Sequence, residues 1–295
     1  MADTQNEVYR QAYASNIMQL AQQKYAKLMP ICFIKPNVKA KVFYQDQIGA
    51  WEMETKSGRN VATPNNDPKL ARRMGTMLDF HDNRLLDRGD ELRMLSDPRS
   101  AYTIAAAQSI GRKIDTQIAE RILATSYSGE LGATSVTLGT TSVAAHVNPT
   151  GGATGTAATL TFARVREAKK VLDLESVEMD DRFAVVDPYS LDQMLAIEQV
   201  TSADYAAVKA LIRGEIDTWM GFKWIVSTQL SSSGTTTSCF FSQRYAVCLA
   251  MASEPLVRTD ERKDLSYSWQ VYYEINIGVV RLEEARIVQM DVNNA

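Results

Sequence analysis

The sequence predicts a mixed α+β fold, and three features along the chain support this prediction. Residues 97–125 carry the pattern of one long helix, residues 267–279 alternate as one long strand, and residues 42–86 have the composition of a long hairpin. Apolar residues at three- and four-residue steps indicate a helix, whereas strict alternation indicates a half-buried strand. A rod-like helix beside an extended antiparallel sheet is one way of burying the apolar face of each element.

Composition and charge narrow the class of protein. The chain has 295 residues, of which 45% are hydrophobic and 23% charged, so we expect about two globular domains. Its net charge of -3 and pI near 5.6 exclude a general positive field for nucleic acid. Three cysteines without a C-x-x-C spacing argue against a disulfide framework and a zinc site. The polar N-terminus and the lack of an 18-residue apolar run predict a cytosolic protein without a signal peptide or membrane-spanning helix.

The N-terminal segment predicts an amphipathic helix over residues 5–28 that ends before Pro30. Six basic and two acidic residues between positions 1 and 41 give this segment a local charge of +4. Its basic side chains could contact phosphate, and a solvated face is an equally good interpretation. The candidate DNA-facing residues are Arg10, Lys24 and Lys27.

Residues 42–55 and 71–86 read as two strands that flank a turn-rich stretch at 56–68. In the second arm, alternation places Met74, Thr76, Leu78 and Phe80 on one face, opposite Arg73, Asp79 and His81. Residues 42–96 hold eight basic and nine acidic side chains. We therefore expect a hairpin too polar to be buried in its own subunit, which pairs with charges on another molecule.

The clearest element is the long helix, with Asp97 as its N-cap and Pro98 at its first position. Roughly 28 residues would make a helix of about 42 Å. Its apolar face is predicted to contain Ile104, Ala107, Ile110, Ile114, Ile118 and Ile122.

Shorter elements follow the long helix. Residues 126–161 are rich in Gly, Ser, Thr and Ala, which favours short strands and a loop near Asn148. Thr161 is predicted to cap a helix, and Asp187 with Pro188 to begin another. Further predictions are a strand at 182–186, a helix near 205–212, a strand at 221–227 and a turn at 231–237. The alternating strand at 267–279 would span about 43 Å and pack along the long helix.

The sequence offers little support for an enzymatic activity. The chain has two histidines, and no H-E-x-x-H, G-x-S-x-G or G-x-G-x-x-G pattern. The best candidate for a metal site is an acidic segment that contains Asp79, His81, Asp82, Asp87 and Asp90. A charged surface exposed to solvent is a far better interpretation of this segment. In a second acidic group, Asp180, Asp181 and Asp187, the last residue already serves as a helix cap. We predict no catalytic residue, no metal site, no cofactor and no enzymatic activity.

Several short sequence motifs, taken in their order along the chain, resemble those of a known protein family. Residues 86–102 read LDRGDELRMLSDPRSAY and continue into GRKIDTQI at 111–118. Residues 183–188 read FAVVDP and are followed by TSADY at 201–205 and GFKWIVS at 221–227; residues 278–288 read GVVRLEEARIV. In this order, the motifs resemble the major capsid proteins of tailed bacteriophages with the Hong Kong 97-type fold, a fold that encapsulin shells also use.

The resemblance implies an N-terminal arm (1–37), an extended loop (38–93), a peripheral domain (94–182 and 246–295) with a long spine helix and a long antiparallel sheet, and an axial domain (183–245). It implies a subunit that self-assembles into hexamers and pentamers of an icosahedral head enclosing double-stranded DNA, assembled in the bacterial cytoplasm. In that family the extended loop lies over an adjacent subunit. The implied intersubunit residues are Trp51, Glu52, Glu54, Arg59, Arg72 and Arg73.

Partners implied by the resemblance are other copies of the chain, a separate scaffolding protein, a portal, in some relatives a decoration protein, and packaged DNA held through non-specific contacts, without a membrane. Two alternatives remain at this point. One is an encapsulin-like compartment that encloses cargo enzymes. The other, more remote, is a metal-dependent hydrolase that uses Asp79 and His81.

Overall fold

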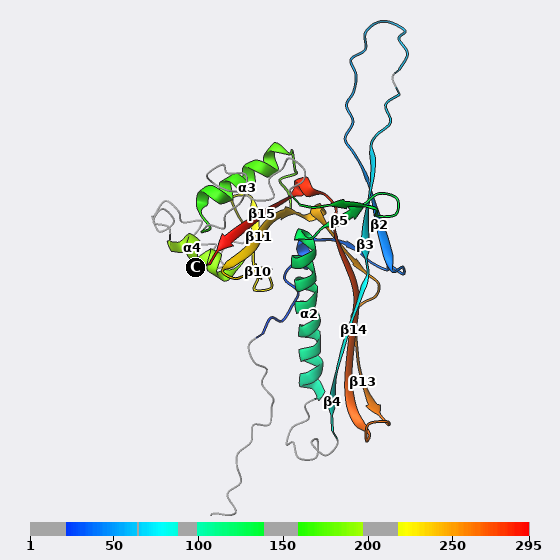
Figure 1. Ribbon diagram of the computed structural model, residues 1–295, viewed down its shortest axis with the longest axis vertical. Helices are drawn as coiled ribbons and strands as arrows, with labels where there is room; N and C mark the ends of the chain where they lie inside the picture. The colour runs from blue at the N-terminus through cyan, green and yellow to red at the C-terminus, as the bar shows by residue number, and fades with distance from the viewer. Residues whose placement is uncertain (1–21, 64, 88–98, 139–158, 197–217, 295) are drawn as a thin grey trace, which may run out of the picture. The chain divides into compact units, whose positions relative to one another are not determined.

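The computed structural model describes residues 22–63, 65–87, 99–138, 159–196 and 218–294, which form two compact units (Figure 1). The first unit contains residues up to 25, 79–112 and 254–275, and the second contains 26–78, 113–253 and 276–295. The long helix and the long strand contribute residues to both units. The predicted cap at Asp97 and Pro98, the loop near Asn148 and the helix near 205–212 lie outside the described residues.

The first unit is built on β14 (Ser268–Arg281), which confirms the predicted long strand. Its initial residues pair antiparallel with β13 (Leu256–Arg262), from Leu256 opposite Glu274 to Arg262 opposite Ser268. β4 (Leu78–Leu86) pairs with the other side of β14, and the Tyr273 hydroxyl donates to Asp82 Oδ2 at 2.7 Å. This hydrogen bond lowers the pKa of the Asp82 carboxyl.

The long helix is α2 (Arg99–Leu123), of 25 residues. Ile110, Ile114, Ile118 and Ile122 are buried as predicted, because a four-residue spacing keeps side chains near one face. The prediction is wrong at the start of the helix, where Ile104 is 53% exposed and Ala107 is also exposed. Six residues turn a helix through about 600°, so Ile104 lies about 120° around the axis from Ile110.

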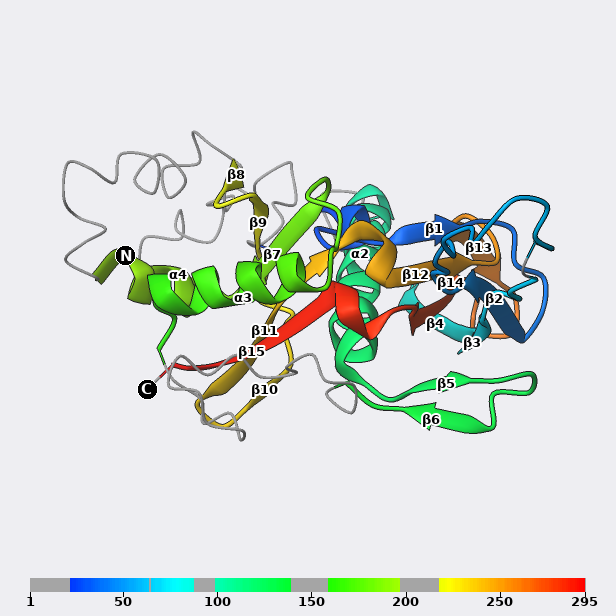
Figure 2. The same ribbon diagram turned by 90° about the horizontal axis from the view of Figure 1, so that it is seen from above.

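In the second unit, a six-stranded sheet has the order β10-β11-β7-β9-β8, with β15 paired to β11. Its strands are β7 (Arg182–Val186), β8 (Thr218–Trp219), β9 (Phe222–Val226), β10 (Ser232–Ser233), β11 (Thr236–Gln243) and β15 (Ile287–Asn293). α3 (Phe162–Leu174) packs on this sheet through Val165, Ala168 and Leu172 (Figure 2). The predicted strands at 182–186 and 221–227 are confirmed, with the second one residue shorter at each end.

Both helices beside this sheet begin at the predicted caps. The Thr161 hydroxyl accepts from the Arg164 backbone N–H at 3.4 Å, and Asp187 Oδ1 accepts from the Ser190 backbone N–H at 3.0 Å at the start of α4 (Pro188–Ala196). A side-chain oxygen at this position satisfies an N–H that has no partner inside the helix.

A second sheet region of the same unit surrounds the final residues of β14. β1 (Phe33–Lys35) runs parallel to β12 (Val247–Met251), and β12 pairs antiparallel with residues 277–281. From Ile277 to Arg281 every residue of β14 is buried, whereas the earlier part of the strand contains buried and half-buried residues. A strand covered on both faces needs no exposed side.

The extended hairpin consists of β2 (Val42–Ile48) and β3 (Leu70–Thr76), paired antiparallel from Val42 opposite Thr76 to Ile48 opposite Leu70. β3 also pairs with β5 (Ser126–Ser128), which pairs with β6 (Thr134–Val136), so the short strands predicted after α2 are present. The predicted arms were too long. Strand pairing ends at Ile48, and the second arm is divided at the buried Met77 into β3 and β4.

The predicted N-terminal helix is wrong over its described part, residues 22–28, which are irregular and lead into the 3-10 helix η2 (Met29–Ile31). The backbone N–H groups of Lys27 and Leu28 donate to the two carboxylate oxygens of Asp115, at 2.8 and 2.9 Å. Asp115 is fully buried on α2. It satisfies N–H groups that a continuous helix would have paired internally.

Candidate intersubunit surface

The inner face of the hairpin is fixed to its own chain. Arg73 Nε and Gln47 Nε2 both donate to the backbone carbonyl of Leu282, at 2.9 and 3.0 Å. Arg73 Nη2 forms an ion pair with Glu284 Oε2 at 2.5 Å. Arg73 is only 9% exposed, so this cation belongs to the interior of the subunit.

Glu284 also holds a second buried cation. Its Oε1 accepts from Arg281 Nε at 3.2 Å, and Arg281 is fully buried. The Arg281 guanidinium further donates to the carbonyls of Ile122, Ala124 and Val136, at 2.7 to 3.0 Å. Burial lowers the pKa of Arg281, and the nearby charge of Arg73 lowers it further.

A steric contact lies on the same face. The Phe43 ring occupies a slot between two glycines, Gly75 on β3 and Gly278 on β14. A Cβ atom at Gly75 would lie 2.2 Å from Phe43 Cζ, and a Cβ at Gly278 would lie 2.7 Å from Phe43 Cε1. Only residues without a side chain allow the ring to sit there. We call the contacts of Phe43, Gln47 and Arg73 with this part of the chain the hairpin root.

The outer face of the same strands is exposed where their pairing ends. Ile48 and Leu70 stand opposite each other at the end of the pairing and are 67% and 76% exposed. Beside them, Arg72 Nε donates to Asp46 Oδ1 at 2.6 Å, and the Arg72 guanidinium lies 5.4 Å from the Tyr44 ring centroid. The ion pair lowers the pKa of Asp46 and raises that of Arg72.

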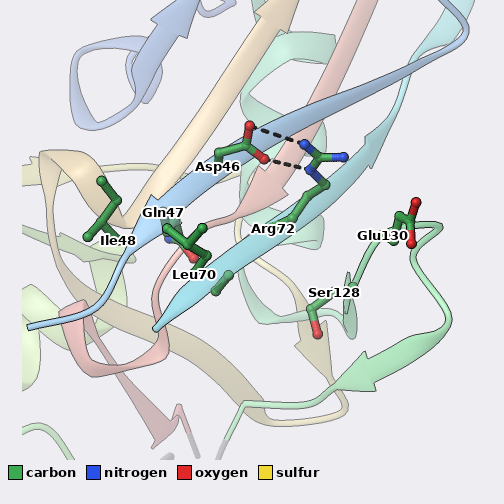
Figure 3. A pocket seen from close by; sticks show the side chains of 9 residues that line it. Asp46, Gln47, Ile48, Leu70, Arg72, Ser128 and Glu130 are labelled. Carbon is green, nitrogen blue, oxygen red and sulfur yellow. Dashed lines mark hydrogen bonds and ion pairs between the residues drawn. The ribbon is translucent and has the colours of Figure 1, made fainter. Parts of the chain in front are cut away.

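A hollow of about 830 Å³ lies on this face. Figure 3 shows the side chains that line it. One wall is made by the ends of β2 and β3, with Asp46, Ile48, Leu70 and Arg72, and the other by the turn after β5, with Glu130. Apolar surface therefore lies between charged groups of both signs. This mixture is typical of a surface that another protein covers.

Beyond the paired strands, the described residues 49–63 and 65–69 form the hairpin tip, which runs on from β2 and β3 (Figure 1). Trp51 is 64% and Met53 95% exposed. The Gly49 N–H donates to the Lys69 carbonyl at 2.7 Å where the tip begins, and Asn66 Nδ2 donates to Glu54 Oε1 at 2.9 Å. The tip thus presents large apolar side chains with little support from its own chain.

The six predicted intersubunit residues separate into two groups. Trp51, Glu52, Glu54 and Arg59 are all exposed on the tip, and Arg72 is on the outer face. Arg73, which alternation places on one face with Asp79 and His81, is buried, because its carboxylate and carbonyl acceptors lie within its own subunit, whereas Asp79 and His81 are exposed. Alternation separated Arg73 from its neighbours Arg72 and Met74 but did not decide which of them is buried. Nothing in the sequence pattern indicated that Glu284 and Leu282 are the partners of Arg73.

Of the candidate DNA-facing residues, Arg10 lies outside the described residues, and Lys24 and Lys27 are exposed. Lys27 Nζ donates to the Val226 carbonyl at 3.0 Å, so part of its hydrogen-bonding capacity is used within the chain.

Within the residues that the structure describes, no three His, Cys, Asp or Glu side chains are grouped to hold a metal ion. Asp90 of the acidic segment lies outside them, and Asp82 is engaged by Tyr273 and by Arg84 at 3.2 Å. Cys32, Cys239 and Cys248 are buried free thiols, and burial raises the pKa of Cys248 to about 11 and that of Cys239 to about 12. No described helix is long and apolar enough to cross a membrane.

Comparisons with solved structures agree on the fold. The capsid of Ralstonia phage GP4 matches with a TM-score of 0.74 and 11% identity over 99% of this chain and 97% of the other. The capsid of cyanophage P-SCSP1u gives 0.72 and 14% over 98% and 94%, and that of cyanophage Pam1 gives 0.71 and 14% over 100% of both chains. A comparison with curated proteins found no match.

The family itself is established by the sequence. A profile of the family described as phage capsid protein matches residues 6–293, nearly the whole chain. The resemblance found in the order of the sequence motifs is therefore confirmed. The chain belongs to the phage capsid protein family and is a structural protein, a major capsid protein that forms the head shell of a bacteriophage.

Proposed function

We propose that the chain assembles into hexamers and pentamers of an icosahedral, Hong Kong 97-type shell around double-stranded phage DNA, in the cytoplasm of the host. The proposed division is an N-terminal arm (1–37), an extended loop (38–93), a peripheral domain (94–182 and 246–295) and an axial domain (183–245). In this arrangement the hairpin tip and the outer face around Ile48 and Leu70 contact a second copy of the chain.

The observation that carries the proposal is the contrast within the hairpin. Its root is buried through Arg73 and Phe43, whereas Trp51 and Met53 at the tip are exposed. Large exposed apolar side chains on an arm that extends from the subunit mark a protein contact. Because the tip and the surface that receives it differ, the contact is heterologous, and heterologous contacts generate rings when the rotation closes.

Electrostatics support a container for DNA. A chain with a net charge of -3 does not bind DNA tightly by counterion release, so packaged DNA can move during filling and ejection. Lys24 and Lys27 would supply only local contacts with the genome. A separate scaffolding protein, a portal and a decoration protein complete the set of proposed partners, and the proposal includes no cofactor.

The test is the size distribution of purified protein by chromatography with light scattering, followed by negative-stain microscopy. Particles of about six times 32.8 kDa, or closed shells, are expected for the wild-type chain. A variant in which a short Gly-Ser linker replaces residues 51–68 should remain monomeric and folded. A wild-type chain that stays monomeric at high concentration, even with its scaffolding protein present, would overturn the proposal.

The content of the shells tests the second part of the proposal. Double-stranded DNA inside particles from infected cells is expected. Particles that instead enclose an enzyme would indicate an encapsulin-like compartment built on the same fold.

A further inference from the structure

The contacts at the hairpin root contain an imbalance of charge. Two guanidinium groups, Arg73 and Arg281, lie inside the subunit and share one carboxylate, Glu284. Among the residues that the structure describes, no other carboxylate forms an ion pair with either arginine. Arg73 Nη1 is buried without a hydrogen-bond partner. An unpaired buried charge is costly, so the position of Glu284 between the two cations matters more than that of an exposed acid.

Glu284 lies where separate segments of the second unit meet. Through Arg73 it is joined to β3 of the hairpin, and through Arg281 to the end of β14. Arg281 extends the connection to the carbonyls of Ile122 and Ala124, at the end of α2, and of Val136 on β6. One carboxylate therefore links the hairpin to the long helix and the long strand.

The Phe43 slot fixes the same root by shape. The ring fills the space above Gly75 and Gly278, which restricts how closely β2 and β14 approach. Arg73 adds polar contacts at the same root, because it is held by both the Leu282 carbonyl and Glu284. The root is thus fixed by the shape of the Phe43 slot and by the ion pair and hydrogen bond of Arg73.

We propose that Glu284 is a positioning residue for shell assembly: by neutralising Arg73 and Arg281 together, it fixes the direction in which the hairpin leaves the subunit. The inference rests on the proposed contact between the hairpin and a second copy. Without the carboxylate, the two buried cations repel each other. Arg281 still donates hydrogen bonds to three backbone carbonyls, so Arg73 and the strand that carries it are the part of the root that moves.

The test compares Glu284→Gln with Glu283→Gln, the same change one residue earlier. Glu283 forms an ion pair with Arg286 at 2.5 Å, and its side chain is 48% exposed, so its loss leaves the root intact. Spin labels are placed at cysteines introduced at Ile48, at the end of β2, and at Lys170, exposed on α3. The native cysteines are buried, and unsubstituted protein provides the control for their labelling.

In unassembled subunits, the distance distribution between the labels should be narrow for the wild type and for Glu283→Gln, and wide for Glu284→Gln. The unlabelled Glu284→Gln chain should remain folded but lose shell yield by about tenfold, which corresponds to about 1.4 kcal/mol. A wild-type distribution or a wild-type yield for Glu284→Gln would overturn the inference. It would leave the proposed function intact as long as the tip-replaced variant still fails to assemble.

Should Glu284→Gln not fold, Glu284→Asp replaces it. An aspartate keeps the negative charge, but it is one methylene shorter and so cannot reach Arg73 and Arg281 together. A widened distance distribution would support the positioning role, and an unchanged one would overturn it. If the wild-type chain itself does not assemble, the proposed function fails first, whatever the labels report.

Discussion

The root and the tip belong to the same extended hairpin, yet they differ in how far their large side chains are buried. At the root, Phe43 and Arg73 are buried and every contact is made within the subunit. At the tip, Trp51 and Met53 are exposed although their residue types favour burial. The root behaves as an interior, so its changes should lower the stability of the subunit, and a change at Glu284 should in addition alter the direction of the hairpin. The tip behaves as half of an interface, so its changes should alter assembly.

The largest loss of stability is expected from Arg281→Met. This substitution removes a buried cation, so three backbone carbonyls lose their hydrogen-bond donor and Glu284 loses one of its ion pairs. The free energy of unfolding should fall by about 3–5 kcal/mol. Urea unfolding of the unassembled subunit measures the loss. Arg121→Met, at an exposed position of α2, is the matched control and should change little. Equal effects of the two substitutions would remove the distinction between root and surface.

A smaller loss is expected from filling the Phe43 slot. Gly75→Ala places a methyl group against the ring and should cost about 1–3 kcal/mol of unfolding free energy. The control is Gly58→Ala at the tip, whose Cβ meets Val61 Cγ2 at an ordinary 3.4 Å and should change stability by less than about 0.5 kcal/mol.

The slot predicts coupling as well. Combining Gly75→Ala with Phe43→Leu should cost less than the sum of the two single changes, because the smaller side chain leaves room for the methyl group. Simple additivity in a double-mutant cycle would show that the two residues do not share the slot.

A weaker effect is expected at the outer face, where Arg72 lowers the pKa of Asp46 below 3.8. A depressed carboxyl pKa stabilises the folded state above the unfolded pKa, and this contribution is lost as the pH falls through the folded pKa. Arg72→Met should return the Asp46 pKa towards 3.8 and remove that part of the acid dependence. Carbon-detected NMR titration follows the carboxyl directly. An unchanged Asp46 titration in the variant would mean that the ion pair does not form in solution.

The smallest change in folding is expected at the tip. Trp51→Ser with Met53→Ser should alter the free energy of unfolding by less than about 0.5 kcal/mol, because both side chains are exposed. Shell yield, measured by light scattering, should nevertheless fall. Leu174→Ser, which removes an exposed apolar side chain from the end of α3, is the control. Unimpaired assembly of the tip variant would argue that the tip is not part of the contact.

Several elements could be predicted from local sequence because their signals are local. The period of the apolar residues located α2 and β14, and Thr161 and Asp187 marked the starts of α3 and α4. Strand pairing of the hairpin also followed from two extended runs around a turn-rich stretch. The order of such elements, each weak by itself, was enough to indicate the capsid family.

Only the tertiary structure decided which faces are covered. Alternation placed Arg73 opposite Met74, but the buried side was set by Leu282 and Glu284, more than 200 residues further along the chain. Ile104 is apolar, as core residues usually are, but it is exposed. Asp115 is charged, as surface residues usually are, but it is fully buried, because its carboxylate accepts hydrogen bonds from two backbone N–H groups of the N-terminal segment. A periodic pattern defines the faces of a helix or strand. Burial depends on which distant segments supply the partners that each polar group needs.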